Sequence, residues 1–317
     1  MRIIKSTDPI DVPHPILVIF GQPGVGKTSL GYSGKDPLLL DFDQGAHRAI
    51  NRRDTLAIAS WADALELVEA KGALDAYATI TVDTVGRALD LLSDYLIEKN
   101  PKLGRDGSLS LQGFGKLKAD FRLWLTRVRG MGKDVILLAH QREEKDGEVT
   151  YVRPDAQGAS LGEILKNADL VAYLYMLGRD RVLDFSPTDR WFGKNPAGWS
   201  PFKVPVAAKA TDFLAGLLDQ GREALGHIST ASAALGQQVD DWRDAINTYT
   251  TVEEHQRAIP EVKKLSKTVQ PQVAKLLIGH AASIGFAFDK DRKEFTDPQL
   301  TRRGQQALEA EPAGSLL

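Results

Sequence analysis

Eight consecutive residues, Gly21–Thr28, constrain the fold of this chain more than any other part of its 317-residue sequence. They read GQPGVGKT and fit the pattern G-x-x-x-x-G-K-[ST] at every fixed position. The apolar run 15–20 ends directly before them and is typical of a buried strand, while a helix is expected from Lys27. In such a strand–loop–helix unit the glycines let successive backbone amides point at one anion, and the helix N-terminus adds partial positive charge. The sequence therefore predicts a loop that cradles phosphate groups.

The side chains of this loop have separate expected roles. Lys27 is expected to reach the β- and γ-phosphates of a nucleoside triphosphate, and the Thr28 hydroxyl is expected to ligand Mg²⁺. ATP and Mg²⁺ are therefore the cofactors that the sequence predicts. The residues expected to bind the nucleotide are Gly21, Gln22, Pro23, Gly24, Val25, Gly26, Lys27, Thr28 and Ser29.

A loop of this kind needs an acid near the metal, usually at the end of another apolar strand. The run Thr79–Asp83 supplies one, and Asp83 is expected to hold Mg²⁺ through water. In many ATPases with this loop a Glu follows that acid, but Thr84 stands here, so the residue that orients water must come from elsewhere. Asp41 and Asp43 are the other acids at a strand end, after the apolar run Leu38–Leu40, and strand alternation puts both on one face. Either of them could position water, or the pair could form a local turn.

Apolar, β-branched runs alternate with segments of helical spacing along the first two thirds of the chain. The expected strands are 15–20, 37–41, 78–83, 134–139, 170–176 and 182–185, and the expected helices are 61–70, 86–98, 114–129 and one from Lys27. This alternation predicts an α/β fold with a mainly parallel sheet and right-handed crossovers. Helix signals dominate after about residue 207, so we expect a core at residues 1–225 and a small helical C-terminal region at residues 226–317. The Ser-, Thr-, Ala- and Gly-rich stretch 228–236 is the expected linker.

Two further features mark the C-terminal region. Thr251 and Glu254 have the spacing of a capping box, which predicts a helix start. Residues 257–303 carry 10 Lys and Arg against 5 Asp and Glu, although the whole chain has a net charge of −2. This local excess is either a solvated helical surface or a surface that contacts phosphates.

Composition narrows the class of protein. The chain has no cysteine, which excludes disulfides and thiolate metal sites and fits a reducing cytoplasm. Its sequence has neither a signal-peptide start nor an apolar run of the roughly 18 residues that a membrane span needs. We therefore expect a cytoplasmic protein, located in the host cytoplasm if a phage encodes it, with no membrane partner.

Taken together, these residues resemble the core of the RecA-type recombinases, a P-loop NTPase family. The resemblance covers residues 15–207 and implies a RecA-like P-loop NTPase core. That family has a D-x-E pattern after the second core strand, and Asp41-Phe42-Asp43 is similar to it, which implies that Asp43 activates the attacking water. The run Val135–Gln141 resembles the strand whose terminal Gln senses the γ-phosphate, so this role is expected of Gln141. His140 stands where RecA proteins usually have Asn.

Two later segments extend this resemblance. Residues 142–166 lie where RecA-like proteins place a mobile loop that binds single-stranded DNA. The same segment could instead form a β-hairpin, with its turn at Glu144–Gly147 and a strand at Val149–Val152. The segment Trp191–Lys203 resembles the RecA segment whose lysines reach a neighbouring subunit's nucleotide, which makes Lys194 the candidate for a catalytic role in trans.

The phage group of compact RecA-like ATPases linked to single-strand annealing and recombination is a closer resemblance, carried mainly by residues 137–175. It implies an ATP-binding and ATP-hydrolysing recombination protein that acts on single-stranded DNA in annealing or strand exchange. The implied assembly is a homo-oligomer with nucleotide at the subunit interface, with a recombination or replication protein as a further partner. Tyr151, Trp191 and Trp199 are candidates for stacking on bases.

Two other functions use the same loop. One is a P-loop phosphotransferase, which would close an arginine-bearing lid over a small acceptor, with Arg179 and Arg181 as candidates. The other is a nucleotide-gated scaffold or loader for a replication or recombination partner, in which hydrolysis is weak and the helical region binds that partner. Asp in place of Glu at position 43 favours slow hydrolysis.

Overall fold

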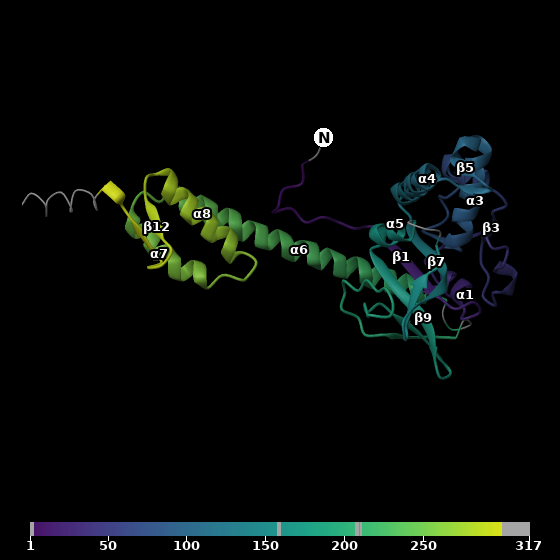
Figure 1. The fold of residues 1–317 in the computed structure, drawn as a ribbon. Helices are drawn as coiled ribbons and strands as arrows, with labels where there is room; N and C mark the ends of the chain where they lie inside the picture. Colours follow the sequence, from purple (N-terminus) through teal and green to yellow (C-terminus); the bar gives the residue numbers. More distant parts are fainter. Residues whose placement is uncertain (1–2, 157–159, 207–208, 210, 300–317) are drawn as a thin grey trace, which may run out of the picture. The chain divides into compact units, whose positions relative to one another are not determined.

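The computed structural model of the protein describes residues 3–156, 160–206, 209 and 211–299. Its main feature is a mixed sheet that has nine strands among these residues (Figure 1). Across the sheet the strands follow the order β11 (Phe202–Val204), β10 (Asp180–Asp184), β9 (Leu170–Leu177), β1 (Ile16–Gly21), β7 (Asp134–Asp146), β4 (Thr79–Asp83), β2 (Pro37–Asp41) and β3 (Thr55–Ala57), and β8 (Val149–Pro154) pairs with β7. The six strands from β9 to β3 are parallel to one another. The predicted α/β fold with a mainly parallel sheet is confirmed.

Both faces of this sheet are buried, which is why its strands read as continuous apolar runs. In β1, alternation places Ile16, Val18 and Phe20 in one hydrophobic cluster and Leu17 and Ile19 in another. The helices that contribute to the first cluster are α2 (Trp61–Glu69), α3 (Val85–Lys99), α4 (Leu111–Gly130) and, through Ile164, α5 (Ser160–Asn167). The second cluster takes residues from α1 (Lys27–Gly31) and from the first turns of α6 (Phe213–Asn247).

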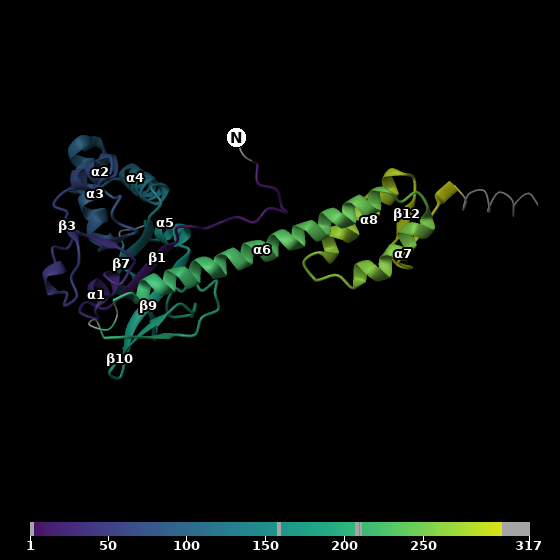
Figure 2. The ribbon, with the colours of Figure 1, turned by 180° about the vertical axis from the view of Figure 1, so that it is seen from behind.

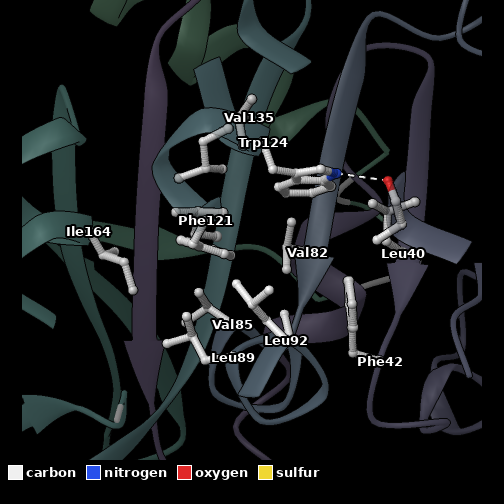
Figure 3. Packing of buried hydrophobic residues seen from close by; sticks show 14 of the residues in the cluster. Leu40, Phe42, Val82, Val85, Leu89, Leu92, Phe121, Trp124, Val135 and Ile164 are labelled. Atoms are coloured by element: carbon white, nitrogen blue, oxygen red, sulfur yellow. Dashed lines mark hydrogen bonds between the residues drawn. The ribbon is translucent and has the colours of Figure 1, made fainter. Parts of the chain in front are cut away.

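Aromatic side chains fill much of the first cluster. Figure 3 shows Phe121 and Trp124 of α4 packed against residues of the sheet and of α3. The indole of Trp124 donates a hydrogen bond of 2.8 Å to the Ala64 carbonyl, so its one polar atom is satisfied inside the cluster. The part of the chain that contains the sheet also has smaller elements: η1 (Ala46–Arg48), η2 (Pro101–Leu103), the strand pair β5 (Gly104–Arg105) and β6 (Ser108–Leu109), and α5 (Ser160–Asn167).

The register of the parallel strands fixes which side chains meet at the carboxyl edge of the sheet. Gly21 pairs with His140 across β1 and β7, and Asp41 pairs with Asp83 across β2 and β4. The phosphate-binding loop follows Gly21 directly. The loop and the two strand-ending acids therefore share one edge, as expected for a ligand site in a parallel α/β sheet.

Residues 142–154 form a hairpin, as the second interpretation of this segment proposed. Strand β7 continues beyond the sheet to Asp146, and its outer half pairs with β8 from Gln141↔Pro154 to Asp146↔Val149. Gly147, with a positive φ of 61°, lies in the turn. The expected loop of residues 142–166 is thus a hairpin followed by α5, apart from residues 157–159, which lie outside the described part.

The chain divides into two compact units, Asp11–Leu225 and a second unit that combines Gly226–Leu317 with Met1–Ile10, within the described residues. The second unit contains the later part of α6, α7 (Val252–Lys263), α8 (Gln270–Ser283) and the hairpin of β12 (Ala287–Asp289) and β13 (Glu294–Thr296). Figure 2 shows α7, α8 and β12 gathered around the end of α6, and apolar residues of these elements form a separate cluster. The capping box of Thr251 and Glu254 is present and begins α7.

Three expectations about this region need correction. The predicted linker at 228–236 lies inside α6, because its alanines favour a helix and Ala233 and Leu235 pack against neighbouring residues. The region also contains the hairpin β12–β13, in which Phe288 and Phe295 pack together with ring centroids 4.8 Å apart. Residues up to Ile10, expected in the core, group with the second unit; the Ile10 amide, for example, donates to the Ser229 hydroxyl. Among the described residues, none of the helices combines the length and apolar character that a membrane crossing requires.

Candidate nucleotide-binding site

The loop Gly21–Thr28 connects β1 to α1 at the carboxyl edge of the sheet. Gly24 and Gly26 have φ values of 77° and 94°, in the left-handed region that glycine adopts without strain. At Gly21 a Cβ atom would lie 2.2 Å from the carbonyl oxygen of Leu174 in β9, so only glycine fits beside that strand. These glycines let the backbone curl into the amide-lined cradle that phosphates bind.

Lys27 is buried within this loop and is 6% exposed. Its amine donates hydrogen bonds of 2.9 Å to the carbonyls of Gly21 and Gln22, and it lies 3.4 Å from Nδ1 of His140. Burial lowers the pKa of Lys27 to about 8, although the carboxylates of Asp83 and Asp43 oppose this shift. The only strong cation inside the loop is thus held by weak, neutral acceptors that a phosphate oxygen would replace favourably.

Thr28 and Asp83 meet at the position expected for Mg²⁺. The Thr28 hydroxyl donates to Oδ2 of Asp83 at 2.6 Å. Burial raises the pKa of Asp83, and the nearby carboxylates of Asp43 and Asp41 raise it further. A hydroxyl and a carboxylate that converge in an electronegative site are the oxygen ligands that Mg²⁺ prefers. The residues present therefore fit the metal, and Thr28 and Asp83 are the side chains that would hold it.

Asp43 is held beside this pair by two side chains. The Thr84 hydroxyl donates to Oδ1 of Asp43 at 3.2 Å, and Nε2 of His140 lies 3.3 Å from Oδ2. The hydrogen bond from His140 is the largest cause that lowers the pKa of Asp43, and its burial opposes it. A cavity of about 200 Å³, also lined by Asp90 and by residues of the segment after β8, opens in front of Asp43. An ionised carboxylate beside a cavity large enough for several water molecules has the properties of a water-orienting base.

Asp41 has a structural role, although alternation placed it on the same face as Asp43. Its two carboxylate oxygens accept hydrogen bonds of 2.9 Å from the amides of Gly45 and Ala46, at the start of η1. Strand β2 ends at Asp41, and the chain then bends so that the Asp43 amide donates to the Asp83 carbonyl at 3.2 Å. The local-turn interpretation thus holds for Asp41, and Asp43 alone faces the site.

Gln141 and Lys194 lie farther from the loop. The Gln141 amide accepts a hydrogen bond of 3.0 Å from the Tyr173 hydroxyl and donates one of 3.1 Å to Glu143, so it contacts β9 and the hairpin. Lys194 pairs with Val171 near the amino end of β9, and its amine donates to the Ala168 carbonyl at the sheet edge away from the loop. γ-Phosphate sensing by Gln141 and a trans role for Lys194 remain predictions. Ser29, the last expected nucleotide contact, lies in α1, where its carbonyl accepts from the side chain of Asn51.

Sequence reasoning missed His140 and Thr84 as members of the site. His140 links the loop lysine to Asp43, with one ring nitrogen near each. Nδ1 of His140 faces the amine of Lys27, and Nε2 faces the carboxylate of Asp43. The sequence signal for His140 was a polar residue directly after the buried apolar run of β7, and in the structure this residue pairs with Gly21 of β1.

This arrangement defines a P-loop nucleotide-binding ATPase, and comparison with known proteins agrees. Residues 14–197, more than half of the chain, match the family described as AAA domain, and the protein belongs to that family. The SPbeta prophage-derived uncharacterized protein YorG of Bacillus subtilis (strain 168) is a relative, 30% identical over 188 residues. The match covers 56% of this chain and 56% of the relative, so it spans about half the length of each protein.

Proposed function

We propose that this protein is an ATP-hydrolysing recombination protein of the phage type that acts on single-stranded DNA, in annealing or strand exchange. The observation that carries the proposal is the course of β7. Its first half lies in the central sheet between β1 and β4, and its second half forms the projecting hairpin with β8. His140 and Gln141 lie where the strand changes from one role to the other. Strand β7 therefore connects the nucleotide site directly to the hairpin, so hydrolysis of the nucleotide could alter the position of the hairpin surface.

The hairpin surface has the chemistry that single-stranded nucleic acid binds. Arg142 and Lys145 are exposed on β7, and Arg142 forms an ion pair with Glu144 on the same strand. The guanidinium of Arg153 lies over the rings of Tyr151 and Phe192, at 4.9 Å and 4.3 Å from their centroids. Cations that contact phosphates, together with aromatic rings on which bases stack, favour binding without sequence preference.

Of the three aromatic candidates, Tyr151 fits this role best. Trp191 packs against Tyr173 with ring centroids 5.3 Å apart, and Trp199 packs against Phe185 at 5.0 Å. Both tryptophans thus contribute to the packing of the fold. The prophage origin in the name of the relative YorG supports a phage setting, and with it the host cytoplasm as the location.

Within the proposed cycle each side chain of the site has a role. Thr28, and Asp83 through water, would hold Mg²⁺, which would neutralise charge on the phosphates of ATP. Lys27 binds the β- and γ-phosphates, and Asp43 orients the attacking water. The proposed assembly is a homo-oligomer in which Lys194 approaches the nucleotide of a neighbouring subunit.

The test is the ATPase rate with and without a long oligo(dT) strand, at about 50 and 200 mM salt. We expect stimulation by the DNA that fades at the higher salt. Arg153→Ala should lose the stimulation and keep the basal rate, whereas Lys102→Ala, an exposed lysine of η2, should behave as the unmodified protein. Equal rates with and without DNA at both salt concentrations would reject the proposal.

A nucleotide-gated scaffold or loader is the second candidate, and one observation favours it. A groove of about 640 Å³ lies between α6 and α8, with Arg243 and Lys275 beside apolar residues such as Ile246 and Leu276. A surface of this composition suits a protein partner. Slow, DNA-independent hydrolysis together with nucleotide-dependent binding of a replication or recombination protein would favour this function. The phosphotransferase alternative depended on an arginine-bearing lid, but Arg181 belongs to strand β10 of the central sheet.

A further inference from the structure

A second cationic side chain lies against the phosphate-binding loop. Arg181 is half-buried near the start of β10. A Cβ atom added at Gly26 would lie 2.5 Å from Nη1 of Arg181, closer than a Cβ approaches another heavy atom. The guanidinium therefore occupies the space beside Gly26 that any side chain at that position would need.

The topology of the sheet accounts for this contact. β10 runs antiparallel to β9, and Arg181 pairs with Met176, so the start of β10 lies at the carboxyl edge of the sheet. Alternation puts Arg181 on the same face as Leu183, which packs in one cluster with Leu30 of α1. Strand position and face together bring the side chain to the loop between β1 and α1.

The hydrogen-bond partners of Arg181 leave its guanidinium available to bind an anion. Its Nη2 donates a hydrogen bond of 2.5 Å to the Pro205 carbonyl. Among the described residues no carboxylate forms an ion pair with Arg181, whereas the half-buried Arg222 pairs with Asp134 and Asp219. A guanidinium has five N–H donors, so donors remain after the bond to Pro205. The acids of the site, Asp43 and Asp83, reach the loop from the other side, beyond β7.

We propose that Arg181 binds the α- and β-phosphates of the nucleotide within its own chain, from the flank of the loop opposite Asp83. The backbone amides of a P-loop cradle these two phosphates, whereas the loop lysine reaches the β- and γ-phosphates. Arg181 lies against the backbone of the cradle at Gly26 and supplies it with a permanent positive charge. A guanidinium stays charged at all working pH values and can donate two parallel hydrogen bonds to phosphate oxygens.

The experiment compares Arg181→Ala, Arg181→Lys and the matched control Arg179→Ala. Arg179 is an exposed arginine two residues earlier, at the turn between β9 and β10. Binding of fluorescent ADP and ATP analogues is titrated in the presence of Mg²⁺ and without DNA. We expect Arg181→Ala to raise the Kd for both nucleotides by about tenfold, as the loss of one charged hydrogen-bonding group does. Arg181→Lys should retain part of the affinity, and Arg179→Ala should retain all of it.

Unchanged affinities in Arg181→Ala would overturn the proposal. A loss confined to the ATP analogue would also overturn it, because a contact to the α- and β-phosphates affects ADP equally. Melting temperatures without nucleotide, measured for each variant, separate a binding defect from unfolding. If Arg181→Ala is unstable, Arg181→Gln replaces it, because glutamine keeps a hydrogen-bond donor and removes the charge. The same rise in the Kd for both nucleotides is then expected. Because the titration contains no DNA, its failure is distinct from a failure of the proposed action on DNA.

Discussion

The two flanks of the phosphate-binding loop carry opposite charges. On the side of β7, β4 and β2, Asp83 and Asp43 approach the loop, together with His140. On the side of β9 and β10, Arg181 lies against Gly26. Lys27 lies between the two flanks, with its amine over the loop.

This difference separates two tasks that a nucleotide site must perform. Metal binding and water activation need oxygen ligands and a base, and these require carboxylates that repel phosphate. Affinity for the phosphate chain needs cations and amides on surfaces from which the carboxylates are absent. The sheet places the acids on one side of β1 and Arg181 on the other. The residues expected for metal binding and hydrolysis therefore lie on one side of the loop, and the arginine proposed for phosphate binding lies on the other.

The largest expected effect comes from the residue between the flanks. Lys27→Ala should lower the ATPase rate by about 10³-fold, because it removes the cation that the phosphates approach. The melting temperature should change little beyond the loss of the two hydrogen bonds to Gly21 and Gln22. Hydrolysis is measured by phosphate release. Unchanged turnover would mean that the chemistry does not take place at this loop.

Asp43→Asn tests the acidic flank separately. We expect the rate constant of hydrolysis to fall about 10²-fold, the usual contribution of a general base, with little change in nucleotide affinity. Asp41→Asn is the matched control, since the Asp41 carboxylate accepts hydrogen bonds from the amides of Gly45 and Ala46 and its loss should affect stability instead. Single-turnover hydrolysis and nucleotide titration distinguish these effects. A loss of affinity equal to the loss of rate would assign Asp43 to binding.

Much of the fold followed from local sequence. Strand β2 and strand β9 were predicted within one residue, because a strand buried on both faces leaves an uninterrupted apolar run. The stretch expected as a linker at 228–236 is helical because its alanines favour a helix, Ala233 is buried and Leu235 packs against the hydrophobic cluster of the second unit. The hairpin β12–β13 was missed because its strands are three residues long and form no clear alternating pattern.

The site was predictable only where a motif or a strand end marked it. Lys27, Thr28 and Asp83 follow from the loop pattern and the apolar run before the acid. The contact between Arg181 and Gly26 joins residues far apart in the chain, and it depends on the register of β10 against β9, which no local spacing encodes. The different roles of Asp41 and Asp43 likewise depend on where β2 ends, because alternation applies only within a strand.

The smallest expected effect is a pH dependence that distinguishes the two cations. Burial lowers the pKa of Lys27 to about 8, so its amine is charged below that pH and loses its proton as the pH rises above it. Phosphate favours the charged form, so ADP affinity should be constant between about pH 7 and 8, where the terminal phosphate is already ionised, and fall above that range by at most about tenfold per pH unit. Arg181→Ala should shift the whole curve to weaker binding without changing its shape, because arginine does not titrate in this range. Lys27→Ala should remove the decline, and a decline that persists in that variant would show that another group titrates near the phosphates.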